Sequence, residues 1–324
     1  MFRAALLALL LTMVPAAGAT AQNAGRDSEV SVETPTGRLA GTLTTPARAG
    51  DAAVLILPGS GPTDRNGDNP ATGPSGTYRL LAEALAERGV ASLRFDKRGL
   101  GGSAGAIARK EDLRFTANAD DALAWLELLR SRTGARRVFV LGHSEGALTA
   151  ALVAQRADLA GVILAAGAGR PAVDVIREQL RAGATPPELA ARANAVFDAL
   201  RRGETVDDVP PALAALFRPS IQPYLRSWLF LDPAEELARS RVPALVLQGD
   251  RDVQIPVADA RRLAAARPGV RLTVLPGVSH ILKPAPEDRA GNIASYADPA
   301  LPLAPAAVDA VAEFIARPGV SPPR

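Results

Sequence analysis

Short apolar runs alternate with amphipathic stretches along most of the chain. The runs are typical of strands buried on both faces of a sheet and lie at 52–59, 90–95, 137–141, 160–166, 243–248 and 271–275. The amphipathic stretches have helical periodicity and cover 77–89, 116–132, 146–156, 257–266 and 305–316. The first of them ends at Gly89, a residue type common at the C-terminus of a helix. Parallel strands need such crossover connections. The pattern therefore predicts an α/β fold with a mostly parallel sheet and helices on both faces.

A different pattern comes before the first apolar run. Residues 28–46 alternate between apolar and polar positions, with Gly37 near the middle, as in two strands of an antiparallel hairpin. Together with the six apolar runs, this hairpin predicts a sheet of about eight strands, the first two antiparallel.

Residues 170–240 interrupt the alternation, because they contain no apolar run of the buried-strand type. They show helical stretches that open with proline or close with glycine, at 172–183, 186–203 and 210–230. Inserted between two core strands, this block predicts a helical cap over the strand ends. It holds many of the few aromatic residues, for which ordinary packing onto the core is favoured; these are Phe217, Tyr224, Trp228 and Phe230.

The first 21 residues have the pattern of a secretory signal peptide. Arg3 supplies the positive charge, an apolar stretch runs to about Val14, and the small residues Ala19-Thr20-Ala21 follow. An uncleaved membrane anchor is the alternative, but Pro15 and the small-residue tail disfavour a spanning helix. We therefore expect cleavage after Ala21, a secreted or periplasmic protein with no stable membrane anchor, and one domain over 22–324 that includes the cap.

Composition narrows the chemistry further. With 324 residues, 48% hydrophobic and 22% charged, the chain can bury a large core, and its net charge of +3 is spread without basic runs, so no nucleic-acid partner is expected. The absence of cysteine excludes disulfides, thiolate nucleophiles, a lipoprotein anchor and cysteine-based metal sites. Two histidines disfavour a histidine-rich metal site, and no lysine follows a glycine as a phosphate loop requires. We expect neither metal nor cofactor.

A serine lies at the junction of one apolar run and the next helix. Gly142-His143-Ser144-Glu145-Gly146 matches G-x-S-x-G between a buried strand and a helix, which is the context that a nucleophile elbow requires. The glycines permit a tight turn that projects the serine hydroxyl, and the helix N-terminus favours negative charge there. Ser144 is the candidate nucleophile.

A serine hydroxyl needs a base to take its proton. His143 adjoins Ser144 in the sequence, so its side chain leaves in another direction, and a structural role behind the turn is expected for it. His280 follows the last apolar run, at the same edge of the sheet, and is the candidate base by elimination. Asp250 and Asp252 both qualify by residue type as the carboxylate that orients the base.

These residues resemble the α/β-hydrolase superfamily, with Ser, acid and His in that chain order. The resemblance covers residues 30 to 317 and is greatest to secreted bacterial esterases and serine-aminopeptidase-like hydrolases; the motifs that carry it are LPGSGPTDRNG, LRFDKRGLGGS, GHSEG, QGDRDVQIP and SHILKP. It implies an α/β-hydrolase fold and favours Asp252 over Asp250, which would then shape the turn. It also implies an oxyanion hole of backbone amides, one from Glu145 and one from Ser60, with Gly61 second.

Two other motifs are partial matches. Asp64, Asn66 and Asp68 have the first spacings of a calcium loop, but Asn69 replaces the required glycine and Ser75 the terminal glutamate. The stretch at 99–104 matches G-x-G-x-x-A after a strand, but the next predicted helix begins too late for a dinucleotide site.

The sequence therefore predicts a serine hydrolase that cleaves a small-molecule carboxylic ester through an acyl-enzyme. A serine aminopeptidase or another acyl hydrolase is the alternative, and a secreted binding protein that keeps the fold is the non-enzymatic one. The ester is favoured because the cap stretches at 212–217 and 224–231 offer apolar surface for an acyl chain, whereas the cap acids Glu178, Asp198, Glu235 and Glu236 fall at solvated positions.

Overall fold

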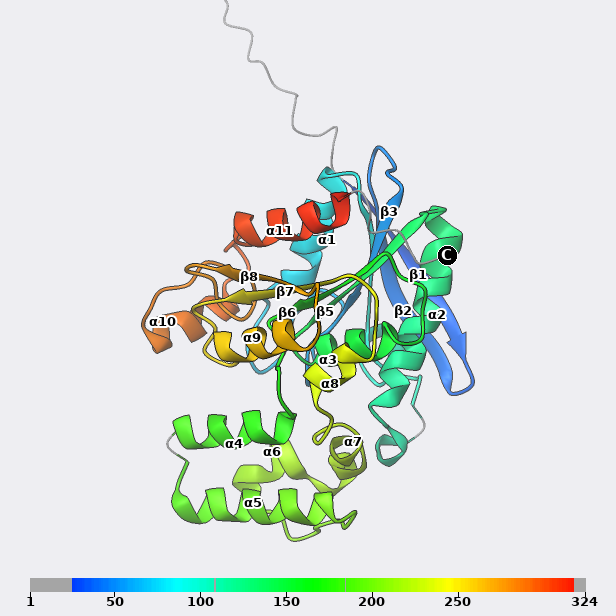
Figure 1. The fold of residues 1–324 in the computed structure, drawn as a ribbon. Helices are drawn as coiled ribbons and strands as arrows, with labels where there is room; N and C mark the ends of the chain where they lie inside the picture. The colour runs from blue at the N-terminus through cyan, green and yellow to red at the C-terminus, as the bar shows by residue number, and fades with distance from the viewer. Residues whose placement is uncertain (1–24, 108, 184, 318–324) are drawn as a thin grey trace, which may run out of the picture.

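An eight-stranded sheet forms the centre of the molecule (Figure 1). The computed structural model describes residues 25–107, 109–183 and 185–317. The strands are β1 (Arg26–Thr34), β2 (Gly37–Thr45), β3 (Ala52–Leu57), β4 (Ala91–Phe95), β5 (Arg137–His143), β6 (Gly161–Ala165), β7 (Ala244–Gly249) and β8 (Arg271–Leu275). Their spatial order is β1-β2-β4-β3-β5-β6-β7-β8. Pairs β1/β2 and β2/β4 are antiparallel and the others are parallel, so the predicted α/β-hydrolase fold is confirmed.

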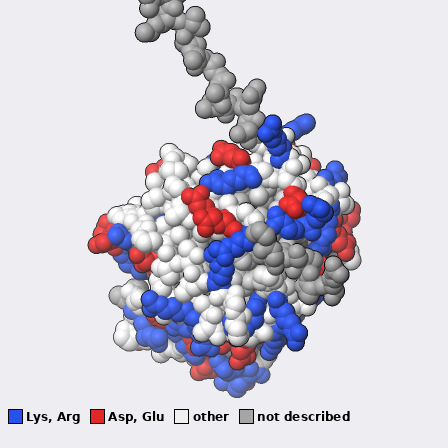
Figure 2. Space-filling model, turned by 45° about the horizontal axis from the view of Figure 1, so that its top comes forward, with Lys and Arg blue, Asp and Glu red and all other residues white. Residues whose placement is uncertain are grey.

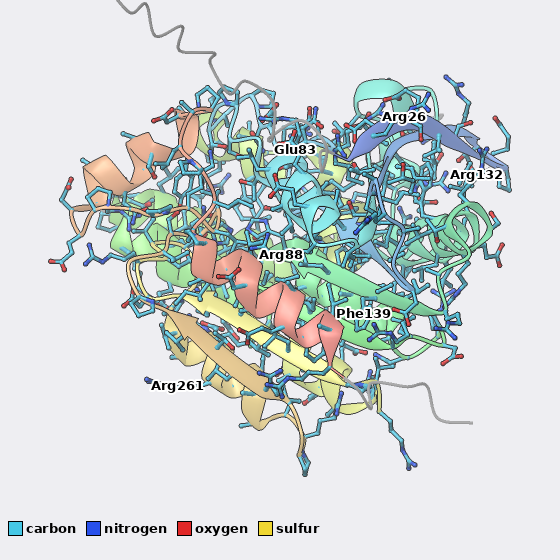
Figure 3. The ribbon with its side chains drawn as sticks, turned by 90° about the horizontal axis from the view of Figure 1, so that it is seen from above. Arg26, Glu83, Arg88, Arg132, Phe139 and Arg261 are labelled. Carbon is cyan, nitrogen blue, oxygen red and sulfur yellow. The ribbon has the colours of Figure 1, made fainter. Side chains whose placement is uncertain are left out.

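Helices cover both faces of the sheet because successive side chains of each buried strand point to opposite sides. Val54 and Ile56 of β3 pack towards α1 (Thr77–Glu87) and α11 (Pro305–Ala316). Leu55 and Leu57 belong to the opposite layer, which is built with α2 (Thr116–Thr133), α3 (Glu145–Val153), α8 (Pro233–Ala238) and α9 (Val257–Ala265). Figure 3 looks onto α1 and α11, and the labelled Phe139 of β5 packs its ring edge-on against Phe314 of α11, with the ring centroids 6.1 Å apart.

The chain between β6 and β7 is helical and lies beyond the strand ends (Figure 1). It contains α4 (Ala172–Ala182), α5 (Pro187–Arg201), α6 (Ala214–Phe217), α7 (Gln222–Arg226) and α8. Residues 172–230, here termed the helical segment, have an apolar cluster of their own, whose fully buried members include Val173, Phe197, Phe217 and Leu229. The segment meets the core where Trp228 stacks on Phe115, with a centroid separation of 5.4 Å.

Short elements complete the fold between the main helices and strands. They are α10 (Arg289–Ala294) and five 3₁₀ turns, η1 (Gly101–Ser103), η2 (Lys110–Asp112), η3 (Pro211–Leu213), η4 (Pro219–Ile221) and η5 (Ser295–Ala297). The sequence pattern did not predict α10 or η5, since so short a segment shows no helical periodicity. Within the described ranges, no helix has both the length and the apolar character needed to cross a bilayer. The predicted signal peptide, residues 1–21, lies outside them.

Charged side chains of both signs are interspersed on the face drawn in Figure 2. Across the described residues, many charged side chains are paired, for example Arg88 with Asp309 at 2.7 Å and Arg137 with Asp51 at 2.8 Å. Such exposed pairs contribute little to stability. Because positive and negative side chains are interspersed, the face drawn in Figure 2 has no extended patch of one sign.

Candidate active site

Ser144 occupies the sharp turn between β5, which ends at His143, and α3, which begins at Glu145. Its φ of 56° and ψ of −120° are rare for a residue with a side chain and mark local backbone strain. A Cβ atom at Gly142 would lie 2.0 Å from the Gly146 carbonyl oxygen, and one at Gly146 would lie 2.5 Å from that of Leu57. The two glycines are therefore required by close backbone contact, and the strained turn presents the serine at the carboxyl edge of the sheet.

His280 and Asp252 form a buried hydrogen-bonded pair at the same edge. His280 Nδ1 lies 2.8 Å from Asp252 Oδ2, and the two side chains are 5% and 0% exposed. Asp252 Oδ1 also accepts hydrogen bonds from the backbone amides of Gln254 and Ile255, at 2.8 and 2.9 Å. Burial opposes ionisation of Asp252, but His280 and these amides outweigh it and hold the pKa of the carboxyl below its usual range. An ionised Asp252 fixes the proton of His280 on Nδ1 and leaves Nε2 free to act as a base.

Asp250, the other candidate acid, makes a different contact. Its Oδ1 accepts a hydrogen bond of 2.7 Å from the backbone amide of Gly277, in the turn that follows β8. The residue is exposed, whereas Asp252 contacts His280 directly. Asp250 therefore holds the turn that carries the histidine loop.

Ser144 and His280 line one cavity of about 130 Å³. Its other walls come from the loop between β3 and α1, including Gly59 and Ser60, and from Gln254 and Tyr296. Among the described residues of the cap range 170–240 none lines it, so the apolar lining predicted from the cap stretches is wrong for this cavity. The reason is that Leu213, Phe217, Leu225 and Leu229 are buried against one another inside the helical segment.

The two backbone amides of the oxyanion prediction belong to the helix that follows Ser144 and to the loop that lines the cavity. Glu145 is the first residue of α3, and the amides of a first helical turn have no partner within the helix. Ser60 is exposed and lines the cavity, while the amide of its neighbour Gly59 is used in a 2.8 Å hydrogen bond to the Tyr78 hydroxyl. Gly61, the second candidate, is exposed with a φ of 67°.

Lys97 ties this loop to the turn that carries the serine. Its Nζ donates to the Gly59 carbonyl at 2.5 Å and lies 3.8 Å from Glu145 Oε1. The Tyr224 hydroxyl, from α7, donates to the same Glu145 oxygen at 3.0 Å. Burial lowers the pKa of Lys97, and Glu145 opposes that effect. Sequence analysis missed this role, because one lysine beside an arginine after a strand carries no signal of what it will contact.

His143 connects the loop between β3 and α1 to His280 through a chain of hydrogen bonds. Its Nε2 lies 2.8 Å from the His280 carbonyl oxygen, which can only accept, so Nε2 carries the proton. Its Nδ1 must then accept from the Tyr78 hydroxyl at 2.9 Å, and that hydroxyl oxygen accepts from the Gly59 amide. The structure thus places His143 behind the turn, where it holds the backbone of His280.

The protonation state of His143 makes stability depend on pH. Burial, followed by the nearby His280, lowers its pKa to about 4. Between pH 6.5 and 4 the unfolded chain therefore binds a proton that the folded chain does not, and stability falls as pH falls. By pH 4.5 we expect this residue alone to reduce the unfolding free energy by roughly 2 to 3 kcal/mol relative to pH 7.

Urea unfolding of wild type and His143→Gln at pH 7 and pH 4.5 checks this expectation. Glutamine can still donate to the His280 carbonyl but does not titrate, so the variant should lose less stability on acidification. Equal losses in the two proteins would show that His143 is not held neutral.

The residues of the two partial motifs, the loop at 64–68 and the stretch at 99–104, make hydrogen bonds within the protein. Asp64 Oδ1 accepts hydrogen bonds from the amides of Asn66 and Asp68, and Asp68 Oδ1 accepts from that of Gly76. Within residues 25–107, 109–183 and 185–317, no three His, Cys, Asp or Glu side chains are grouped so that they could hold a metal ion. In the glycine-rich stretch after β4, the Gly102 amide donates to Asp96 Oδ2 at 2.8 Å. These loops support the wall of the site.

Comparison with known proteins places the chain among hydrolases. The family described as "Serine aminopeptidase, S33" matches residues 72–283. Esterase EstD of Thermotoga maritima is 28% identical over 256 residues, which are 75% of this chain and 58% of that relative, so the chain spans little more than half of its length.

Solved structures share the fold at lower identity. Est1E of Butyrivibrio proteoclasticus, whose structure has ferulic acid bound, is 18% identical with a TM-score of 0.57 over 89% of this chain and 100% of that one. A proline iminopeptidase of Mycobacterium smegmatis is 20% identical with a TM-score of 0.53 over 78% and 92% of the two chains. The fold is thus shared with a protein that binds ferulic acid and with a proline iminopeptidase. With its strand order, its serine turn and a family match over more than half of its length, the chain belongs to the serine aminopeptidase S33 family of the α/β-hydrolase superfamily.

Proposed function

We propose that the chain is a carboxylesterase that acts through Ser144, His280 and Asp252. The Ser144 hydroxyl attacks the ester carbonyl carbon while His280 Nε2 takes its proton. Asp252, held by its hydrogen bond to His280 Nδ1, stabilises the imidazolium. The same proton then passes to the alcohol oxygen as the C–O bond breaks. This leaves an acyl-Ser144, which water hydrolyses by the reverse proton path.

The amides of Glu145 and Ser60 are proposed to bind the oxyanion of the tetrahedral intermediates. Their support is positional, since one opens α3 directly after the serine and the other lies in the loop that lines the same cavity. The Lys97 contact with the Gly59 carbonyl keeps that loop beside the serine turn. A rigid loop matters because oxyanion donors act only when they are held in place before the charge develops.

The choice of ester over aminopeptide rests on the charge of the cavity. A serine aminopeptidase must bind a protonated α-amino group, which calls for a carboxylate near the serine. None of the described residues that line the cavity with Ser144 and His280 has a carboxylate side chain. Nearby carboxylates are already engaged: Glu145 with Lys97 and Tyr224, and Glu178 with Arg170 at 2.5 Å. The name of the Thermotoga maritima relative gives the same preference.

A side-by-side assay tests this proposal. Purified protein should hydrolyse p-nitrophenyl butyrate with a kcat/KM at least on the order of a hundredfold above that for amino-acid p-nitroanilides, because an ammonium group gains no partner in a neutral cavity. The Ser144→Ala protein supplies the blank for spontaneous hydrolysis. Efficient anilide cleavage that requires a free amino group, with weak ester turnover, would instead support the aminopeptidase.

A further inference from the structure

Gly59 lies directly beside the nucleophile, and both of its backbone groups are engaged. A Cβ atom added to Gly59 would come within 3.3 Å of the Ser144 Cβ atom. The Gly59 amide donates to the Tyr78 hydroxyl at 2.8 Å, and the Gly59 carbonyl accepts from Lys97 Nζ at 2.5 Å. The side chains of Tyr78 and Lys97 therefore fix the orientation of Gly59, and of the peptide unit that follows it, next to Ser144.

The carbonyl that Lys97 contacts belongs to the same peptide unit as the Ser60 amide. In a trans peptide the C=O and N–H bonds point in opposite directions, and the described residues contain no cis peptide bond. The Ser60 N–H therefore points away from Lys97. It donates to no backbone carbonyl among the described residues, so this N–H can donate to an oxygen of a bound molecule.

Lys97 brings a positive charge to this peptide unit. An ammonium group that donates to a carbonyl oxygen draws electron density towards that oxygen, and the N–H of the same unit becomes a stronger donor, because linked hydrogen bonds polarise one another. Such effects are strongest where water is excluded. The Lys97 and Glu145 side chains are only 12% and 4% exposed, which meets this condition.

The Glu145 carboxylate and the Lys97 ammonium compensate each other. Burial lowers the pKa of Lys97, and Glu145, whose Oε1 lies 3.8 Å from Nζ, favours the charged form. An unpaired carboxylate on the residue next to Ser144 would repel a developing oxyanion. Its Oε1 is instead held by Lys97 and by the Tyr224 hydroxyl, so the pair brings no net negative charge to the site.

We propose that Lys97 is a positioning residue for the oxyanion hole, and that its ammonium orients and polarises the Gly59–Ser60 peptide so that the Ser60 amide becomes a stronger donor. This inference rests on the proposed esterase function. Negative charge develops on the ester oxygen only as Ser144 attacks, so a stronger donor stabilises the transition state more than the bound ester. The contribution of Lys97 is therefore expected in kcat and not in KM.

Lys97→Met tests this expectation with a neutral side chain of similar length. On p-nitrophenyl butyrate its kcat should fall about thirtyfold with KM within about threefold of wild type, which is less than the loss from removing an oxyanion donor outright. Arg88→Met is the matched control, since it removes a cation that is 36% exposed and paired with Asp309. Its kcat should stay within about twofold of wild type, because an exposed charge far from the reaction is screened.

The absence of cysteine allows the charge to be restored at this one position. Lys97→Cys is unfolded in urea and alkylated with 2-bromoethylamine, which returns an ammonium at the length of lysine, or with 1-bromopropane, which gives a neutral chain of equal length. After refolding, the ammonium-bearing protein should regain at least about a third of the wild-type kcat, while the propylated one stays about thirtyfold below it. Wild-type protein carried through the same steps controls for refolding.

Equal kcat in two alkylated proteins of equal melting temperature would overturn the proposal, as would a loss in Lys97→Met that appears in KM alone. Lys97→Met needs no refolding and decides the question if an alkylated protein does not regain the wild-type circular dichroism. If wild-type protein cleaves no ester, the esterase proposal itself fails, and calorimetric binding of butylboronic acid tests Lys97 alone, since its adduct with Ser144 is tetrahedral and anionic. A dissociation constant raised about tenfold or more in Lys97→Met would support the inference, and an unchanged one would refute it.

Discussion

Replacement of Ser144 by alanine is expected to reduce ester hydrolysis by a factor on the order of a thousand or more. The variant lacks the only atom that the proposed mechanism uses as a nucleophile, while the strained turn around it depends on Gly142 and Gly146 and should persist. Alanine at a φ of 56° bears the same strain as serine, so the melting temperature should change little. Steady-state kinetics on p-nitrophenyl butyrate and thermal unfolding measure both quantities.

His280→Ala should cause a loss of the same order, and the double variant with Ser144→Ala should be no worse than either single one. Residues that act as one unit in a single step give such non-additive losses. Full activity in His280→Ala would show that another group serves as the base and would refute this assignment.

Asp252→Asn is expected to reduce kcat by roughly 10³- to 10⁴-fold. An asparagine amide would present a donor to His280 Nδ1, which would push the proton to Nε2 and leave no lone pair facing the serine. The matched control is Asp250→Asn, two positions away, which alters only the 2.7 Å contact with the Gly277 amide. We expect its kcat within about threefold of wild type. If Asp250→Asn were the more damaging change, Asp252 would not be the orienting acid.

Much of the fold could be predicted because each strand that is buried on both faces of the sheet appears in the sequence as a short apolar run. The run at 137–141 became β5, which the structure extends to His143, and the stretch at 305–316 became α11 with the same bounds. A parallel sheet brings the carboxyl ends of its strands to one edge, so residues that follow β5, β7 and β8 had to come together there. Chain order and strand position were therefore enough to nominate Ser144, His280 and an acid at either Asp250 or Asp252, and the resemblance to the α/β-hydrolase superfamily favoured Asp252.

The contacts around these residues could not be predicted in the same way. Tyr78 and His143 are 65 positions apart, and His143 and the carbonyl it binds are 137 apart, so only the packed fold brings them within hydrogen-bond distance. The polar lining of the cavity that contains Ser144 could not be predicted for a related reason. The apolar stretches of the cap range were expected to line the site, but their buried side chains pack against one another inside the helical segment.

Because the helical segment has an interior of its own, its sequence and that of the sheet with its covering helices can change at different rates during evolution. Because the helical segment packs apolar side chains in a cluster of its own, substitutions inside that cluster leave the strand ends in place. The segment contacts the core through side chains such as Trp228, which stacks on Phe115. Its direct hydrogen bond to the serine turn is that of Tyr224 with Glu145. Laboratory evolution can therefore recombine this segment as a cassette between related scaffolds, provided that the hydroxyl at position 224 is kept.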